Sequence, residues 1–156
     1  MNDTLIQQSS IELTRAGNVQ QQISQKEFEI KLVDINGKYL SNQDAGSYYY
    51  NQQRKQLLEM EISSLKAQRD GNINSALYYA LMLAEKEITD HVIFSSASIL
   101  IANICSFLRI QNISFSASMP IVIKVSTLYS QLNMMNTVGF VSLKRELLNL
   151  KMQLHI

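Results

Sequence analysis

The sequence predicts a mainly helical domain with one β-hairpin near its start, and three observations support this prediction. Residues 27–41 alternate polar and apolar side chains around an Asn-Gly pair, which is typical of two strands joined by a tight turn. Elsewhere, apolar residues recur at steps of three and four, and one charge-free run has the length of a helix. A chain of 156 residues, 46% of them hydrophobic, is expected to fold as one domain. We therefore expect a bundle of four to five helices over residues 27–156.

Residues 1–26 contain six glutamines and few large apolar groups, which predicts a flexible polar leader. They lack the basic and apolar regions of a cleaved signal peptide, so we expect a chain that is cytoplasmic as synthesised. Rich in Ser, Thr, Gln, Ile and Asn, the segment resembles the uncleaved N-terminal segment of bacterial type III secreted proteins. That resemblance implies export without cleavage. Removal of residues 1–25 is expected to leave thermal stability nearly intact.

The hairpin is predicted over residues 27–41. Phe28, Ile30 and Leu32 fall on one face of a strand, with charged residues on the other. Asn36 and Gly37 tolerate the positive φ angles of a type I′ turn. A lone hairpin is marginal in water, so its apolar face must rest on helices.

Two helices are predicted next, over residues 47–70 and 73–90. Gly71 and Asn72 between them are typical of a helix stop. The second helix has the cleaner stripe, with apolar residues at steps of three and four from Ile73 to Ile88.

Residues 92–108 contain no charged side chain and predict a helix buried in the core. The run is short for a membrane span and is diluted by four serines and an asparagine. Because residues 92–123 carry only one charge, Arg109, insertion of part of this segment into a membrane is retained as an alternative.

Residues 112–127 fit two structures. Strict alternation of apolar and polar residues favours strands, which would make the fold α+β. Helical spacing that continues to Leu132 and Met135 favours a helix that starts near Pro120. We favour the helix, with residues 110–118 extended.

Residues 140–154 show the clearest coiled-coil spacing in the chain. Its apolar positions are Phe140, Leu143, Leu147, Leu150 and Leu154. Two heptads cannot stand alone, so this seam must pack on a partner. The partner is either the chain's own helix that ends near Met135 or a second protein.

No pattern of catalytic or ligand-binding residues is recognisable. The five glycines are too widely spaced for a phosphate-binding loop, because the closest pair is nine residues apart. One cysteine and two histidines argue against zinc chemistry, and Glu87 and His91 do not have the repeated spacing of a di-iron site. Cys105 is expected to be a buried, inert thiol. We expect no cofactor and no metal, and a net charge of +1 makes a nucleic-acid partner improbable.

The best candidate contact residues outside the seam lie at the start of the 47–70 helix. Tyr48, Tyr49 and Tyr50 are consecutive, so they point in different directions and at least one is expected to be exposed. Arg54 follows one turn later, and Tyr and Arg are enriched among the residues that dominate binding energy.

These features favour a non-enzymatic protein-interaction or assembly factor, such as a bacterial secretion-associated adaptor or substrate, or a toxin-neutralising partner. The expected partner is another protein, or a second copy bound through the C-terminal helix. A membrane-active or translocated protein and an enzyme with an unrecognised site are the alternatives.

The seam generates a prediction. Leu147→Asp would place an unpaired carboxylate among apolar side chains, so it is expected to lower the melting temperature or abolish association. Circular dichroism melting and light scattering of both proteins test this, and identical values for variant and wild type would show a solvated face.

Overall fold

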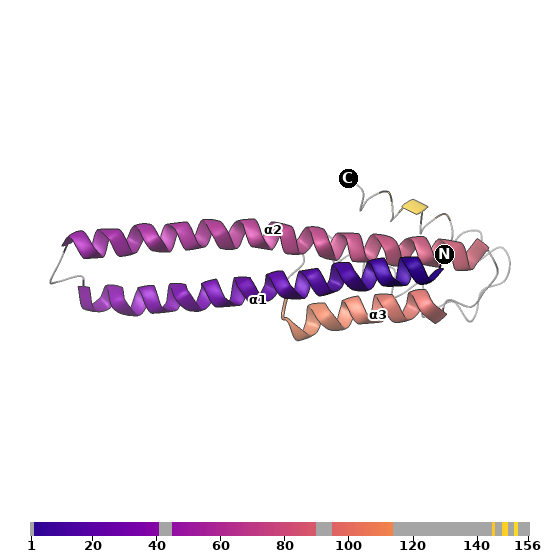
Figure 1. Ribbon diagram of the computed structural model, residues 1–156, viewed down its shortest axis with the longest axis horizontal. Helices are drawn as coiled ribbons and strands as arrows, with labels where there is room; N and C mark the ends of the chain where they lie inside the picture. Colours follow the sequence, from indigo (N-terminus) through magenta and orange to yellow (C-terminus); the bar gives the residue numbers. More distant parts are fainter. Residues whose placement is uncertain are drawn as a thin grey trace. The chain divides into compact units, whose positions relative to one another are not determined.

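The computed structural model describes residues 2–40, 45–89 and 95–113, together with Arg145, Leu148, Asn149 and Met152. The described ranges form three helices, α1 (Asn2–Leu40), α2 (Ala45–Thr89) and α3 (Ser95–Ile110), which Figure 1 shows in chain order. The prediction of a mainly helical chain is confirmed. The chain divides into two compact units, one of Arg15–Asp70 and one of Met1–Thr14 with Gly71–Ile156. We describe each unit by itself.

The predicted hairpin over residues 27–41 is wrong, because residues 27–40 belong to α1 and the described ranges contain no strand. These residues alternate with a period of two, but they also contain a helical spacing. Ile23, Ile30 and Gly37 recur every seven residues, and all three are at least partly buried. Burial of this helical stripe outweighs the local preference of Asn36-Gly37 for a turn.

The predicted leader over residues 1–26 also differs from the structure, which has residues 2–26 as the first part of α1 with no break at residue 27. Ala16, Val19 and Ile23 are buried at a spacing of three and four. Three of the six glutamines in this segment, Gln20, Gln21 and Gln22, lie between Val19 and Ile23. Glutamine is a good helix former, so the composition is compatible with a long helix.

The expected bundle of four to five helices is not seen either. The helices predicted over residues 47–70 and 73–90 are one helix, α2, which runs through Gly71 without a positive φ. A glycine inside a helix costs about 1 kcal/mol relative to alanine. Ile73, Ala76 and Leu77, in the turns that follow, are fully buried. Their burial outweighs the cost of Gly71.

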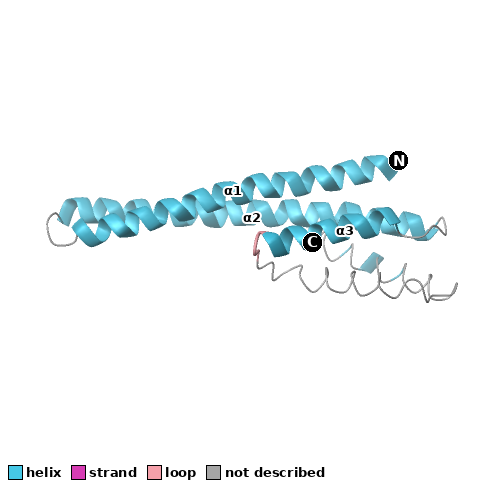
Figure 2. Cartoon of the chain, turned by 90° about the horizontal axis from the view of Figure 1, so that it is seen from below, coloured by secondary structure: helices cyan, strands magenta, loops and turns pink. Residues whose placement is uncertain are grey.

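In the 15–70 unit, α1 and α2 pair antiparallel over an apolar cluster. The buried members are Val19, Ile23 and Ile62, and the partly buried Ile30 and Leu65 pack against them. Figure 2 shows the same two helices side by side from a second direction. This narrow apolar cluster lies between the two helices.

Polar contacts fix the register of this pairing. The Asn51 side chain is buried, and its Nδ2 donates to the backbone carbonyl of Val33 at 2.8 Å. Lys55 Nζ lies 2.8 Å from Asp34 Oδ1, and Lys26 Nζ lies 2.6 Å from Glu61 Oε2. From the Lys26–Glu61 pair to the Asp34–Lys55 pair, the α2 number falls as the α1 number rises, as an antiparallel pair requires. A slipped register would leave the buried Asn51 amide without its acceptor, which costs about 1–3 kcal/mol.

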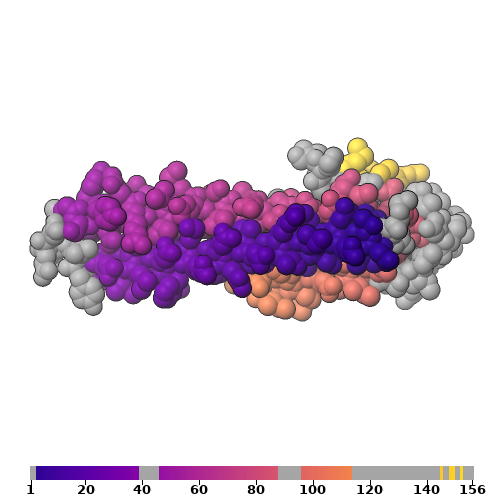
Figure 3. Space-filling model, viewed as in Figure 1, coloured from indigo at the N-terminus to yellow at the C-terminus, as the bar shows by residue number. Residues whose placement is uncertain are grey.

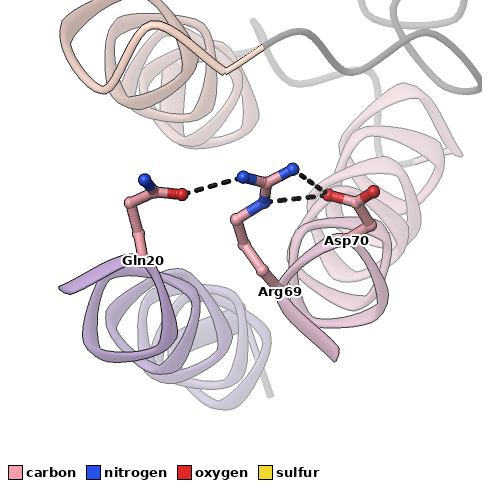
Figure 4. A network of polar contacts seen from close by, with 3 residues as sticks. All are labelled: Gln20, Arg69 and Asp70. Atoms are coloured by element: carbon pink, nitrogen blue, oxygen red, sulfur yellow. Dashed lines mark hydrogen bonds and ion pairs between the residues drawn. The ribbon is translucent and has the colours of Figure 1, made fainter. Parts of the chain in front are cut away.

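Arg69 makes polar contacts at the end of the helix pair near Gln20, as Figure 4 shows. Its Nη1 donates to Gln20 Oε1 at 2.8 Å, and its Nε donates to Asp70 Oδ1 at 3.0 Å. The Arg69 Nη2 atom lies 3.0 Å from the same Asp70 oxygen. Only 8% of the Arg69 side chain is exposed, so Gln20 and Asp70 replace the hydration that its guanidinium loses on burial.

In the second unit, the 71–89 part of α2 is buried along most of its length. Ala76, Ala80 and Ala84 recur every four residues with no exposed area, which lets neighbouring helices approach closely. Ser9, from the first turns of α1, is also buried, and its Oγ donates to the Ala76 carbonyl at 2.9 Å.

The core helix predicted within residues 92–108 is confirmed as α3. Its buried side chains are Ala97, Leu100, Ile101, Ile104 and Leu108. The helix ends in a Schellman turn with Asn112 in the left-handed region at φ 51°. The Ile113 N–H donates to the Leu108 carbonyl at 2.9 Å, and the Asn112 N–H donates to the Arg109 carbonyl at 3.2 Å. Ile113 is buried, so the turn is closed by an apolar contact as well.

Two sequence predictions lie largely outside the described residues. Beyond Ile113, the strand or helix expected within residues 112–127 is not described. The same holds for the apolar seam positions Phe140, Leu143, Leu147, Leu150 and Leu154.

The buried face of residues 2–26 reverses the expectation that a shortened chain keeps its stability. Ile23→Ala removes a fully buried side chain from the α1–α2 cluster and is expected to lower the free energy of unfolding by about 2–5 kcal/mol. Urea titration followed by circular dichroism measures this value. Gln21→Ala, two residues away and exposed, is the matched control and should stay within about 0.5 kcal/mol. Equal midpoints for the two variants would contradict the packing described above.

Candidate protein-interaction surface

On α1, an apolar stripe lies on the side away from α2. Phe28, Leu32 and Ile35 are spaced by four and three, which places them on one face of the helix. All three are exposed, Phe28 by 61%. They alternate with Ile30 and Val33, which are partly or fully buried in the 15–70 unit. We call Phe28, Leu32 and Ile35 the α1 stripe.

On α2, a second exposed group lies at the same end of the 15–70 unit. Tyr49, Tyr50 and Met60 are exposed by 66%, 68% and 70%, and Leu57 by 56%. The group alternates with the buried Leu58. We call Tyr49, Tyr50, Leu57 and Met60 the α2 stripe. Figure 3 shows α1 and α2 in space-filling form, coloured along the sequence.

The two stripes lie at the same level along the paired helices. The ion pairs Lys26–Glu61 and Asp34–Lys55 mark two levels where α1 and α2 meet. Phe28 and Leu32 fall between these levels on α1, and Leu57 and Met60 fall between them on α2. The exposed apolar area of this unit therefore lies at one level, on the outward face of each helix, and exposed apolar groups of this kind are a feature of interaction surfaces.

Some of the contact residues predicted from the sequence are exposed at the start of α2. Tyr48, Tyr49 and Tyr50 are all exposed at the start of α2, and so is Arg54 one turn later. Exposure of at least one tyrosine is thus confirmed, while their role in binding stays a prediction. The other predicted contact residues, Phe140, Leu143, Leu147, Leu150 and Leu154, are outside the described residues.

The sequence does not predict most of the two stripes. It predicts that Phe28 and Leu32 lie on the buried face of a strand, and it does not distinguish Leu57 and Met60 from the other apolar residues of the 47–70 helix. The missed signal is the spacing of Leu58, Ile62 and Leu65, which repeats at four and three without Leu57 and Met60. Two interleaved stripes in one helix indicate one inward and one outward apolar face.

A buried carboxyl group lies at the start of α3. Only 5% of Glu87 is exposed, and its Oε2 atom is buried without a hydrogen-bond partner. Burial raises the pKa of the Glu87 carboxyl above its ordinary value. Hydrogen bonds from the backbone N–H groups of Ala97 and Ser96 offset part of this effect, because they favour the ionised form. These donors belong to the first turn of α3, where a helix leaves its N–H groups unpaired. Glu87 therefore holds α2 against the N-terminus of α3.

Within the described residues, no three His, Cys, Asp or Glu side chains gather as metal ligands would. Cys105, which the sequence predicts to be buried, lies half-buried in α3. His91 is outside the described residues. Of the helices in the described ranges, none combines the length and apolar character that a membrane span requires.

Comparisons of the chain with protein-family models, with curated proteins and with solved structures give no match. The function proposed below therefore rests on the chain's own residues.

Glu87 generates a prediction about pH. Because its pKa is raised in the folded state, the folded chain keeps this proton at pH values where the unfolded chain has lost it. The stability that this proton contributes is fully present below the ordinary value of 4.5 and is lost as the pH rises through the raised pKa. Glu87→Gln keeps an oxygen for the α3 N–H groups and removes the buried charge. It is expected to stabilise the protein at pH 7 by about 1 kcal/mol.

Urea titrations of both proteins from pH 4 to pH 8 measure this difference, which should shrink toward zero at the acidic end. Glu59→Gln, an exposed carboxylate on α2, is the control and should show no comparable trend. A Glu87→Gln protein less stable than wild type at pH 7 would show that the ionised carboxylate stabilises the start of α3.

Proposed function

We propose that this protein is a non-enzymatic protein-interaction or assembly factor that binds its partner through the outward faces of α1 and α2. The observation that carries the proposal is the coincidence of the α1 and α2 stripes at one level of the 15–70 unit. Scattered apolar residues on a surface are ordinary, but a grouped apolar stripe on the outward face of each helix marks a surface of association.

Packing energetics support the same proposal. Two paired helices can bury only one face of each helix, and the α1–α2 cluster of this unit contains five apolar side chains. Seven large apolar side chains, those of the two stripes, remain exposed beside it. Their transfer from water to a protein interface is favourable by about 25 cal/mol per Å². A partner that covers one of the stripes would therefore stabilise the unit as well as bind to it.

The chemistry of the exposed residues favours a protein as the partner. Tyrosine presents a large rigid ring and a hydroxyl group, and it loses little conformational entropy when an interface forms. Arg54 stands beside the tyrosines and can donate to carbonyl or carboxylate groups of a partner. Within this class, a secretion-associated adaptor or substrate and a toxin-neutralising partner are the roles we propose.

The proposal is tested by placing a photo-crosslinking phenylalanine analogue at single positions of the full chain. Position 28 and position 57 probe the two stripes, and position 59, exposed on another face of α2, is the control. Irradiation is carried out in the cells that make the protein and with the purified chain. We expect protein adducts at positions 28 and 57 in at least tenfold higher yield than at position 59. Yields equal to the control in both settings would contradict the proposal.

A further inference from the structure

We propose that the outward face of α2 binds an α-helix of another protein, and that the bound face of that helix is uncharged. This inference rests on the proposed function, because it names the kind of partner that one of the two outward faces takes. It is argued from the 15–70 unit alone, in which α2 has an inward face packed on α1 and an exposed outward face.

The first step is a spacing that α2 repeats on two opposite faces. On the inward face, buried or half-buried residues recur at steps of four and three: Asn51, Lys55, Leu58, Ile62, Leu65 and Arg69. On the outward face, exposed residues recur at the same steps, and we call them the outer row: Tyr49, Gln53, Gln56, Met60, Ser63 and Ala67. This is the heptad spacing with which one helix packs along another. Since the inward face takes a helix, α1, the outer row has the spacing to take a second one.

The second step concerns the backbone. Residues 49–67 lie inside α2, so their N–H and C=O groups are bonded within the helix. An extended segment bound along them would bury its own backbone polar groups without backbone partners, which is unfavourable. A helix satisfies these groups internally. The outward face of α2 therefore favours a helix over a strand or a loop.

The third step is charge. No residue of the outer row is charged, and neither is Leu57 beside it. On one edge of the row, Glu59 is followed by Lys66, and on the other edge Arg54 is followed by Glu61. A charged side chain set against the outer row would lose hydration without gaining an opposite charge. The bound face of the partner is therefore uncharged, and the balanced edges offer no net attraction to a polyanion such as a nucleic acid.

The outward face of α1 does not meet the same condition. The exposed Lys31 lies between Phe28 and Ile35 of the α1 stripe, and the half-buried Glu29 lies beside Leu32. A neutral helix bound there would remove water from these charges without compensation. We therefore assign the uncharged partner helix to α2.

Side-chain size and polarity favour a different protein over a second copy of the same row. Two parallel copies would set Tyr49 on Tyr49 and Ser63 on Ser63, so large residues meet large ones and small residues meet small ones. Antiparallel copies that overlap along the whole row would bury the Gln56 amide against Met60, which offers it no carbonyl or carboxylate acceptor. A matching helix has small residues opposite Tyr49 and Met60 and large apolar residues opposite Ser63 and Ala67.

The test selects helices for the purified full chain from a phage-displayed library of three-heptad peptides. The positions of one helical face vary among Ala, Ser, Gln, Leu, Lys and Glu, and the other positions are fixed. We expect the enriched peptides to lack Lys and Glu on the varied face. By fluorescence anisotropy, the strongest of them should bind Met60→Glu and Ser63→Glu chains more weakly than wild type by a factor of about ten or more. Both positions are exposed, so melting temperatures should not change.

Leu32→Glu, which puts the same charge on the outward face of α1, is the matched control and should bind these peptides like wild type. The inference is overturned if no peptide is enriched, if enriched faces keep Lys and Glu as often as the unselected library, or if Met60→Glu binds as tightly as wild type. It is also overturned if the chain alone dimerises, or pellets with phosphatidylcholine vesicles, in a way that Met60→Glu abolishes. Any of these results together with adducts at position 28 or 57 would leave the proposed function standing. Failure of the crosslinking at both positions would remove the proposed function itself.

Discussion

The antiparallel contact between α1 and α2 is the constraint on which the 15–70 unit depends. Its apolar cluster is narrow, so polar groups carry much of the specificity. The buried Asn51 amide has one acceptor, the Val33 carbonyl, and the Arg69 guanidinium is held by Gln20 and Asp70. Each of these groups is correctly paired in one register only. The cluster holds the helices together, and the polar contacts decide which residues face outward at a given level.

The second unit, Met1–Thr14 with Gly71–Ile156, packs its helices differently. Alanines at every fourth position of α2 leave little side-chain volume, so backbones approach closely and polar groups at the contacts must be satisfied locally. Ser9 does this by donating to the Ala76 carbonyl, and Glu87 by accepting from the first N–H groups of α3. The Schellman turn at Asn112 satisfies the carbonyls at the other end of the same helix. Both ends of α3 are thus capped within the chain.

The sequence predicted the helical class and the buried α3, because a charge-free run bounded by polar residues has few other structures available to it. It did not predict that residues 27–40 are helical. Asn36-Gly37 is a strong local turn signal, and only the tertiary contact of Ile30 and Val33 with α2 overrides it. Gly71 likewise predicted the end of a helix, whereas α2 continues through it. The sequence predicted an exposed tyrosine but not the exposure of Phe28, Leu32, Leu57 and Met60. Inward and outward apolar stripes of a helix cannot be distinguished without knowledge of the neighbouring helix.

The outward face of α2 differs in charge from the solvent face of an ordinary exposed helix. An exposed helix normally carries charged residues across its solvent face, whereas the outward face of α2 from Tyr49 to Ala67 carries none. Amide and hydroxyl groups can be buried with a hydrogen bond at modest cost, but burial of a charge requires a partner charge in good geometry. A neutral face of this length is suited to being covered by another helix. The absence of charge is thus a feature of one surface of the 15–70 unit.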